Sequence, residues 1–130
     1  GGMSGMKFED CNRWRVAVKD WVKQFHGSSV KVINPNDYYN FRSPTHKTEK
    51  EVRDFDLWLV RHSDLVIVNF NNPSSIGTAQ ELAIASELRI PVIGLNEQRF
   101  RLHPWLSESV ERIFDDLAEM LEYVSTYYLD

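Results

Sequence analysis

The spacing of apolar residues switches along the chain between a helical period and short continuous runs. Within residues 8–25 the apolar side chains stand one helical turn apart, at Trp14, Val18, Trp21, Val22 and Phe25. This spacing predicts a first helix with one buried face, which Gly27 ends. Residues 48–62 repeat the helical period behind a capping box made by Thr48 and Glu51, and we predict a second helix there.

Short runs of apolar, mostly β-branched residues predict strands at residues 30–33, 65–70, 91–95 and 112–114. The run 65–70 is nearly continuous, which is typical of a strand covered on both faces, so we place it centrally in a parallel sheet. A helix begins at Asp115, and another covers residues 77–88 with an inward face made by Ala79, Leu82, Ala83 and Leu88.

The alternation of helices and strands predicts one α/β domain over residues 1–130. Its expected architecture is a doubly wound, flavodoxin- or Rossmann-like parallel sheet with helices on both faces. Ligands of such sheets bind beyond the carboxyl ends of the strands, so we expect the site at residues 71–81. Doubly wound domains normally start with a strand, whereas residues 1–6 form a glycine-rich stretch. Either a strand lies ahead of Gly1 or the fold begins with a helix.

Composition excludes several classes of function. The formal net charge is -4 and no dense block of Lys and Arg occurs, so we expect no polymeric nucleic acid as a partner. The apolar runs fall far short of the roughly 20 residues that span a bilayer, so no membrane is expected either. Cys11 stands alone, which rules out a cysteine-cluster metal site and fits a cytoplasmic location. A Rossmann dinucleotide fingerprint and a P-loop are both absent.

Glu81 is the first candidate for chemistry. It stands early in the predicted helix 77–88, directly after a buried strand, where a carboxylate faces the ligand crevice. The helix dipole favours the ionised form, which keeps Glu81 available as a nucleophile toward an electrophilic carbon. A glutamate in an opening turn also simply stabilises a helix. Hydroxyl and backbone donors suited to a sugar or phosphate come from Ser74, Ser75 and Thr78, although any helix N-terminus uses such residues.

Three stretches together resemble the nucleoside 2-deoxyribosyltransferase family. They are Ser-Asp-Leu-Val-Ile-Val at residues 63–68, Pro-Ser-Ser-Ile-Gly-Thr-Ala-Gln-Glu-Leu-Ala at 73–83 and Ile-Pro-Val-Ile at 90–93. The Gly-Thr-x-x-Glu core, here Gly77, Thr78 and Glu81, is the hallmark of the family. The resemblance is best over residues 56–95, weaker at 1–5 and faint after 96. It implies that Glu81 attacks the anomeric carbon of a deoxyribose, displaces the base and forms a covalent glycosyl ester.

The resemblance also implies a second carboxylate that positions the nucleophile and handles protons. In the family this aspartate stands eight residues before the aspartate that opens the strand, and Asp56 stands eight before Asp64, with Asp54 as the fallback. If the helix 48–62 runs antiparallel to the strand, eight residues at about 1.5 Å each bring Asp56 back toward the carboxyl edge and Glu81. The alternative for Asp56 is a solvated helix face.

Two departures from the family pattern bear on the substrate. Many deoxyribosyltransferases have an aspartate six residues before the nucleophile, where this chain has Ser75. A serine removes a negative charge and relieves repulsion against a 5′-phosphate, and the related deoxynucleoside 5′-monophosphate N-glycosidases are similar at this point. The second departure is the amino-terminal strand, which in the family carries an aromatic residue before the glycine loop and has no equivalent here. The backbone of that loop, at Gly2, Ser4 and Gly5, is expected to hold sugar or phosphate.

The sequence therefore predicts an enzyme that cleaves the N-glycosidic bond of a 2′-deoxyribonucleoside and passes the sugar to another base. The alternatives are hydrolysis of deoxynucleoside 5′-monophosphates and a catalytically silent nucleotide-binding module. No cofactor and no metal are implied, and the resemblance leads us to expect a homodimer or larger homo-oligomer. His103 and Trp105 lie where family members contribute residues to a neighbouring subunit, and Trp105 is the best candidate for stacking on a base.

Overall fold

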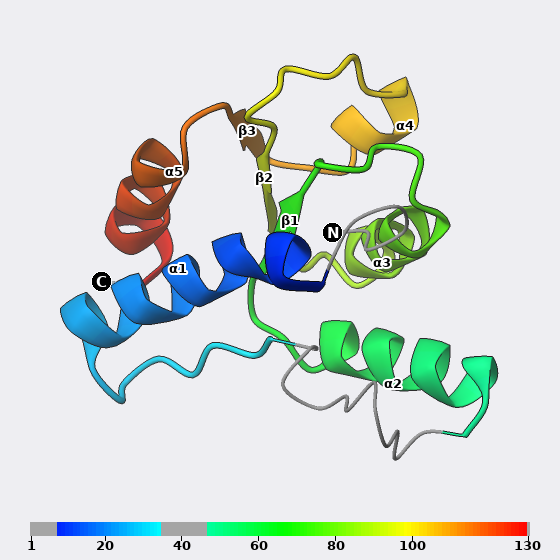
Figure 1. Ribbon diagram of the computed structural model, residues 1–130, viewed down its shortest axis with the longest axis horizontal. Helices are drawn as coiled ribbons and strands as arrows, with labels where there is room; N and C mark the ends of the chain where they lie inside the picture. The colour runs from blue at the N-terminus through cyan, green and yellow to red at the C-terminus, as the bar shows by residue number, and fades with distance from the viewer. Residues whose placement is uncertain (1–7, 35–46, 130) are drawn as a thin grey trace.

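A computed structural model describes residues 8–34 and 47–129, with side chains from residue 13 onward. In chain order the elements are α1 (Phe8–His26), α2 (Glu49–Arg61), β1 (Val66–Asn69), α3 (Ile76–Glu87), β2 (Val92–Leu95), α4 (Pro104–Ser107), β3 (Arg112–Phe114), α5 (Leu117–Val124) and the short π-helix η2 (Ser125–Leu129). The alternation of helix and strand is the predicted one (Figure 1).

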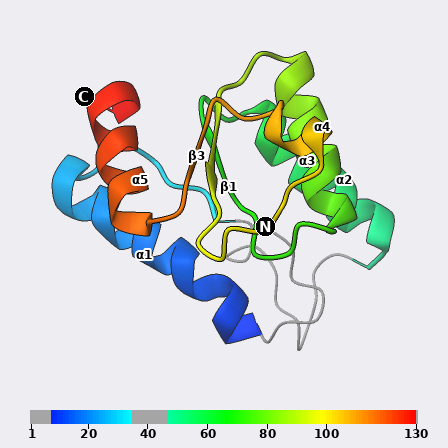
Figure 2. The same cartoon turned by 90° about the horizontal axis from the view of Figure 1, so that it is seen from above.

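The sheet is parallel throughout and has the order β1-β2-β3. Val66 pairs with Val92 and Leu95 with Phe114 in the two registers. Helices α1 and α5 cover one face, and α2, α3 and α4 lie on the other side (Figures 1 and 2). The α/β fold with helices on both faces of a parallel sheet is thus confirmed.

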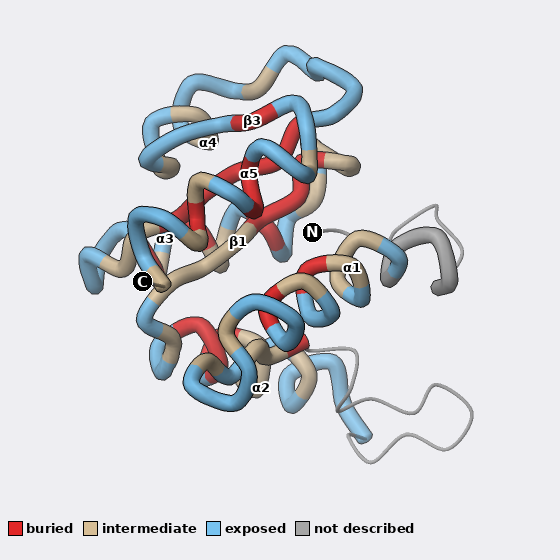
Figure 3. The backbone as a smooth tube through the Cα atoms, turned by 90° about the vertical axis from the view of Figure 1, so that its left-hand side faces the viewer, coloured by how far each residue is buried: buried red, intermediate tan, exposed pale blue. Residues whose placement is uncertain are grey.

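The two faces of β2 divide the core between two apolar clusters. All residues of β2 are buried, as expected for a strand covered on both faces. Since side chains of a strand point alternately to opposite faces, Ile93 and Leu95 join the side of α1 and α5, whereas Val92 joins the side of α3. The buried stretches of the backbone accordingly follow the sheet and the inner faces of the helices (Figure 3).

Two predictions about the strands were wrong. Residues 30–33 are not part of the sheet, because a strand needs a hydrogen-bonded neighbour and a cavity separates this segment from β1. Within the described residues β1 therefore lies at the edge of the sheet, and β2 takes the central position.

The predicted inward face of α3 was also wrong in part. Leu82 is buried, but Ala79, Ala83 and Leu88 are exposed. Apolar residues occur on all sides of this helix, so the sequence pattern alone does not determine which face turns toward the core. Packing against α2 and the sheet instead buries Thr78, Leu82 and Ala85.

Candidate functional site

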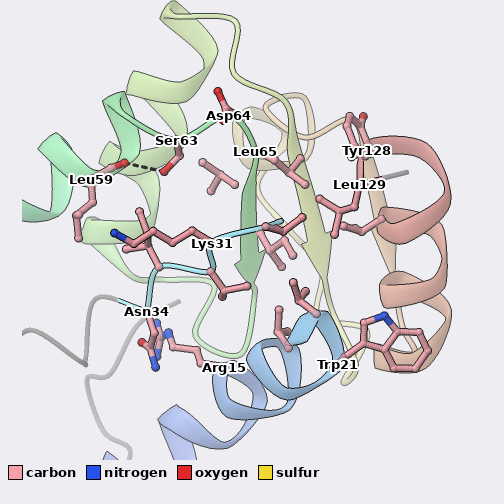
Figure 4. A pocket seen from close by; sticks show the side chains of 18 of the residues that line it. Arg15, Trp21, Lys31, Asn34, Leu59, Ser63, Asp64, Leu65, Tyr128 and Leu129 are labelled. Carbon is pink, nitrogen blue, oxygen red and sulfur yellow. Dashed lines mark hydrogen bonds between the residues drawn. The ribbon is translucent and has the colours of Figure 1, made fainter. Parts of the chain in front are cut away.

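A cavity of about 710 Å³ lies between α1, residues 29–34, α2 and the outer edge of β1. Its long walls are apolar and include Val18, Val22, Val32 and Ile67. Polar groups gather at both ends (Figure 4). Arg15 and Asn34 lie at the end toward which the arrow of β1 points, and Ser63 and Asp64 lie at the opposite end. The first of these ends is the carboxyl end of the strand, where a ligand site was expected.

Glu81 lines this cavity from α3. The helix begins at Ser75, whose Oγ accepts a hydrogen bond from the Thr78 amide at 3.2 Å. A β-carbon built on Gly77 would lie 3.9 Å from Glu81 Oε1 and 3.8 Å from Ser75 Oγ. The carboxyl group of Glu81 thus folds back over the opening turn of its own helix, and the missing side chain of Gly77 leaves one side of it open.

The electrostatic surroundings of Glu81 differ from the expected ones. Burial raises the pKa of Glu81, and the nearby Asp56 carboxylate raises it further, whereas the charge of Arg15 lowers it. We expected the helix dipole to favour the ionised form of Glu81. The net effect is the opposite, because desolvation of the partly buried carboxylate outweighs its attraction to the helix dipole.

Asp56 lines the same cavity from α2, so the fold brings the two predicted carboxyl groups together. Asp54 does not line it. Its carboxylate is paired with Lys50 and Arg53, and the hydrogen bond from Lys50 holds its pKa below the ordinary value. The eight-residue spacing before Asp64 therefore selects the carboxylate that faces the cavity, and the fallback lies elsewhere on the helix.

Sequence reasoning missed three residues at this end of the cavity, namely Trp14, Arg15 and Asn34. The positive charge of Arg15 contributes to lowering the pKa of Glu81. The sequence contained a clue to Arg15, because Arg15, Val18 and Val22 are spaced to share one helical face and both valines are buried. A charged residue on the buried face of a helix is a candidate for a functional site.

The residues at the start of α3 were expected to bind a sugar or phosphate, and the structure places them only partly in that way. Ser74 is exposed, Ser75 is occupied as the helix cap, and neither lines the cavity. Thr78 is 3% exposed, and its Oγ1 is buried without a hydrogen-bond partner among the described residues. The Thr78 hydroxyl is thus buried and does not line the cavity, and its role in holding substrate stays a prediction.

The remaining candidates lie away from this cavity. Gly2, Ser4 and Gly5 fall outside the described residues. Trp105 is 81% exposed on α4 and forms an edge-on contact with His103, at a ring-centre distance of 6.2 Å. Neither ring lines the cavity of its own chain, and the stacking of Trp105 on a base stays a prediction.

The described part of the chain holds no cluster of three or more His, Cys, Asp or Glu side chains that could bind a metal ion. None of its helices combines the length and the apolar character needed to cross a bilayer.

Comparisons with known proteins support the fold and leave the chemistry open. No family model matches the chain, and no curated protein does. Among solved structures, a conserved protein from Enterococcus faecalis V583 matches with a TM-score of 0.80 and 16% sequence identity, over 97% of this chain and 94% of that one. At this identity the match shows a shared α/β fold.

Proposed function

We propose that the protein cleaves the N-glycosidic bond of a 2′-deoxyribonucleoside and transfers the deoxyribosyl group to another nucleobase. The observation that carries the proposal is the pair of carboxyl groups, Glu81 and Asp56, which face one cavity from two different helices. The resemblance of residues 56–95 to the nucleoside 2-deoxyribosyltransferases assigns chemistry to the same two residues.

Two neighbouring carboxyl groups suit this reaction because they can hold different protonation states. An ionised Glu81 would attack C1′ of the sugar through a carboxylate oxygen and form a glycosyl ester. The bond from C1′ to the base nitrogen breaks with its electron pair on the base, and Asp56 would supply the proton that the departing base takes up. A second base would then attack C1′, release Glu81 and return a proton to Asp56.

The raised pKa of Glu81 fits a group that must shed its charge on forming an ester. A carboxylate kept ionised by strong partners is a weak nucleophile, whereas a partly desolvated one gains from reaction. The positive charge of Arg15 offsets part of this effect, because it favours the ionised form.

Hydrolysis of deoxynucleoside 5′-monophosphates is the second candidate. Ser75 stands where many deoxyribosyltransferases have a carboxylate, and it caps the amino-terminal end of α3. A helix end with a neutral cap favours a nearby phosphate, which a carboxylate at the same place would repel.

The test is chromatographic detection of free base from a panel of deoxynucleosides and their monophosphates, with and without an acceptor base. We expect Glu81→Gln to lower base release by at least about a thousandfold, the scale seen when a covalent nucleophile is lost. Glu87→Gln is the matched control, since Glu87 is exposed on the same helix and does not line the cavity.

The pattern of products separates the candidates. Exchange that needs the acceptor base supports the transferase, and release from monophosphates into water supports the hydrolase. Substrate-induced thermal stabilisation without any base release would leave a nucleotide-binding module. Equal turnover by wild type and Glu81→Gln would rule out the glycosyl ester.

A further inference from the structure

A second hollow, of about 390 Å³, opens at the carboxyl ends of β2 and β3, between the loop 96–100, β3 and the start of α5. Its volume falls within the range of about 300–1,000 Å³ that is usual for small-molecule sites. None of the described residues that line it also lines the larger cavity. A ligand in this second hollow is therefore separate from the proposed catalytic site at Glu81.

The loop that follows β2 forms a fixed wall of the second hollow. Asn96 is buried, and its side chain accepts a hydrogen bond from the Phe100 amide at 3.0 Å and donates one to the Phe100 carbonyl at 2.9 Å. The Asn96 amide donates to the Phe114 carbonyl at 2.7 Å, which ties the loop to β3. Arg99 has a left-handed backbone with a φ of 54°, a conformation that a residue other than glycine keeps only where its surroundings hold it. The wall thus exists before any ligand binds.

Four charged side chains line the second hollow, and only two of them pair with each other. Arg99 Nε and Nη2 lie 2.9 and 2.8 Å from Asp115 Oδ2, so these two charges neutralise each other. Among the described residues, the side chain of Glu119 has no hydrogen bond or ion pair, and that of Arg112 contacts aromatic rings alone. An unpaired cation and an unpaired anion therefore line one hollow without contacting each other.

Aromatic rings hold the guanidinium group of Arg112 in place. Its Cζ atom lies 4.8 Å from the ring centres of both Phe114 and Tyr123, and these two centres are 5.2 Å apart. A guanidinium group that contacts rings with its flat face keeps the N–H donors at its edge available. Two of these donors match the two oxygens of a carboxylate. A ligand that carries a carboxylate is therefore the complement of Arg112.

We propose that the second hollow binds an α-amino acid with an apolar side chain. The carboxylate of the ligand binds the edge of the Arg112 guanidinium group, and its ammonium group binds the carboxylate of Glu119. The described lining has two cations and two anions, so a zwitterion suits it better than a phosphate, which the carboxylates of Asp115 and Glu119 repel. Phe100 and Ile113 line the hollow and are 38% and 37% exposed, which offers the side chain of the ligand an apolar contact.

The test is titration of the 1–130 chain with L-leucine, followed by the NMR chemical shifts of the backbone amides. We expect a Kd tighter than about 1 mM and shifts centred on the second hollow. N-acetyl-leucine lacks the ammonium group and leucine methyl ester lacks the carboxylate. We expect each to bind at least about tenfold more weakly than leucine, because each leaves one charged group of the protein unpaired.

Two variants assign the ends of the ligand. Glu119→Gln changes an exposed helix position, and we expect it to lose the preference for leucine over N-acetyl-leucine while it keeps the preference over the methyl ester. Arg112→Gln is expected to show the converse. The matched controls are Glu122→Gln and Arg101→Gln, since both residues are exposed and neither lines the hollow. We expect both controls to keep both preferences.

Three results would overturn the proposal. The first is binding of leucine weaker than about 1 mM, and the second is equal binding of leucine and its two blocked forms by the wild type. The third is an unchanged preference in both Glu119→Gln and Arg112→Gln, or the same loss in the two controls. Shifts centred on Glu81 would place leucine in the larger cavity and overturn the proposal as well. Release of base needs no amino acid, so failure of the proposed function leaves the titration unaffected, and the reverse also holds.

Discussion

The carboxyl group of Glu81 sits partly buried beside that of Asp56, and burial is the larger cause of its raised pKa. A group whose pKa is raised by folding binds its proton more tightly in the folded state than in the unfolded chain. Ionised Glu81 therefore lowers the free energy of unfolding near neutral pH. This loss of stability falls on a residue that the proposed chemistry needs as a carboxylate.

We predict that Glu81→Gln raises the Tm near neutral pH, because a neutral amide replaces a partly desolvated charge. The gain appears as the pH rises from the ordinary glutamate pKa of 4.5 to the raised pKa of Glu81, and it is constant above that. In acid, where wild type is protonated, the two Tm values converge. Thermal melts across this pH range check the prediction, with Glu87→Gln expected to show no such gain. A Glu81→Gln variant that melts below wild type near neutral pH would contradict it.

Single residues also show where sequence patterns carry information and where they do not. The family's eight-residue spacing before Asp64 pointed to Asp56 rather than Asp54, and of the two only Asp56 lines the cavity. Thr78 was assigned a role from its position near a helix start, yet its hydroxyl is buried. Which side of a helix start faces solvent depends on the neighbouring elements, and the local sequence does not contain them.

The bounds of the long helices were predicted from the sequence to within a few residues. The predicted strands formed only where a neighbouring strand pairs with them. The capping box located the start of α2, where the Glu51 amide donates to Thr48 Oγ1 at 3.1 Å. The reciprocal bond is shifted by one residue, since the Glu51 carboxylate accepts from the Lys47 amide at 2.9 Å. Helix signals are local in this way. Residues 30–33 have strand-forming composition, but pairing is a tertiary property that such composition does not determine.

Alanine substitutions at Gly94 and Gly77 are expected to affect stability differently, because the two glycines pack against their neighbours differently. Gly94 lies in β2, where a β-carbon would come 2.8 Å from Phe70 Cε2, and Phe70 is fully buried. We expect Gly94→Ala to lower the free energy of unfolding by about 1–3 kcal/mol through overpacking. Gly77→Ala meets only ordinary contacts of 3.8 and 3.9 Å and is expected to fold at least as stably as wild type. Urea denaturation of both variants checks the pair, and equal stabilities would show that β2 moves to relieve the clash.

The same Gly77→Ala variant separates folding from function. Its new methyl group would stand 3.9 Å from Glu81 Oε1, on the side that Gly77 leaves open to an approaching sugar. We therefore predict a lower rate of base release at unchanged or higher stability. Full activity in a stable Gly77→Ala variant would mean that the sugar approaches Glu81 from another side.

At the scale of the whole molecule, the candidate site exists only because three helices meet at one end of the sheet. Glu81 comes from α3, Asp56 from α2 and Arg15 from α1, and all three line one cavity. The alternation of helices and strands predicted that some residues would gather at the carboxyl ends of the strands. It did not identify Arg15, because the contribution of a helix to a site depends on how the helix packs across the sheet.

Asp56 and Arg15 act on the pKa of Glu81 in opposite directions, and this gives a prediction for the assembled site. Asp56 raises the pKa, so Asp56→Asn moves the acidic limb of the pH–rate profile to lower pH. Arg15 lowers it, so Arg15→Gln moves the limb to higher pH, where more base is needed to ionise the nucleophile. Asp54→Asn is the control for α2, because Asp54 does not line the cavity, and it leaves the limb in place. Since the two charges reach Glu81 from different helices, the double variant lies between the single ones. Shifts of the same sign in both single variants would mean that a group other than Glu81 controls the acidic limb.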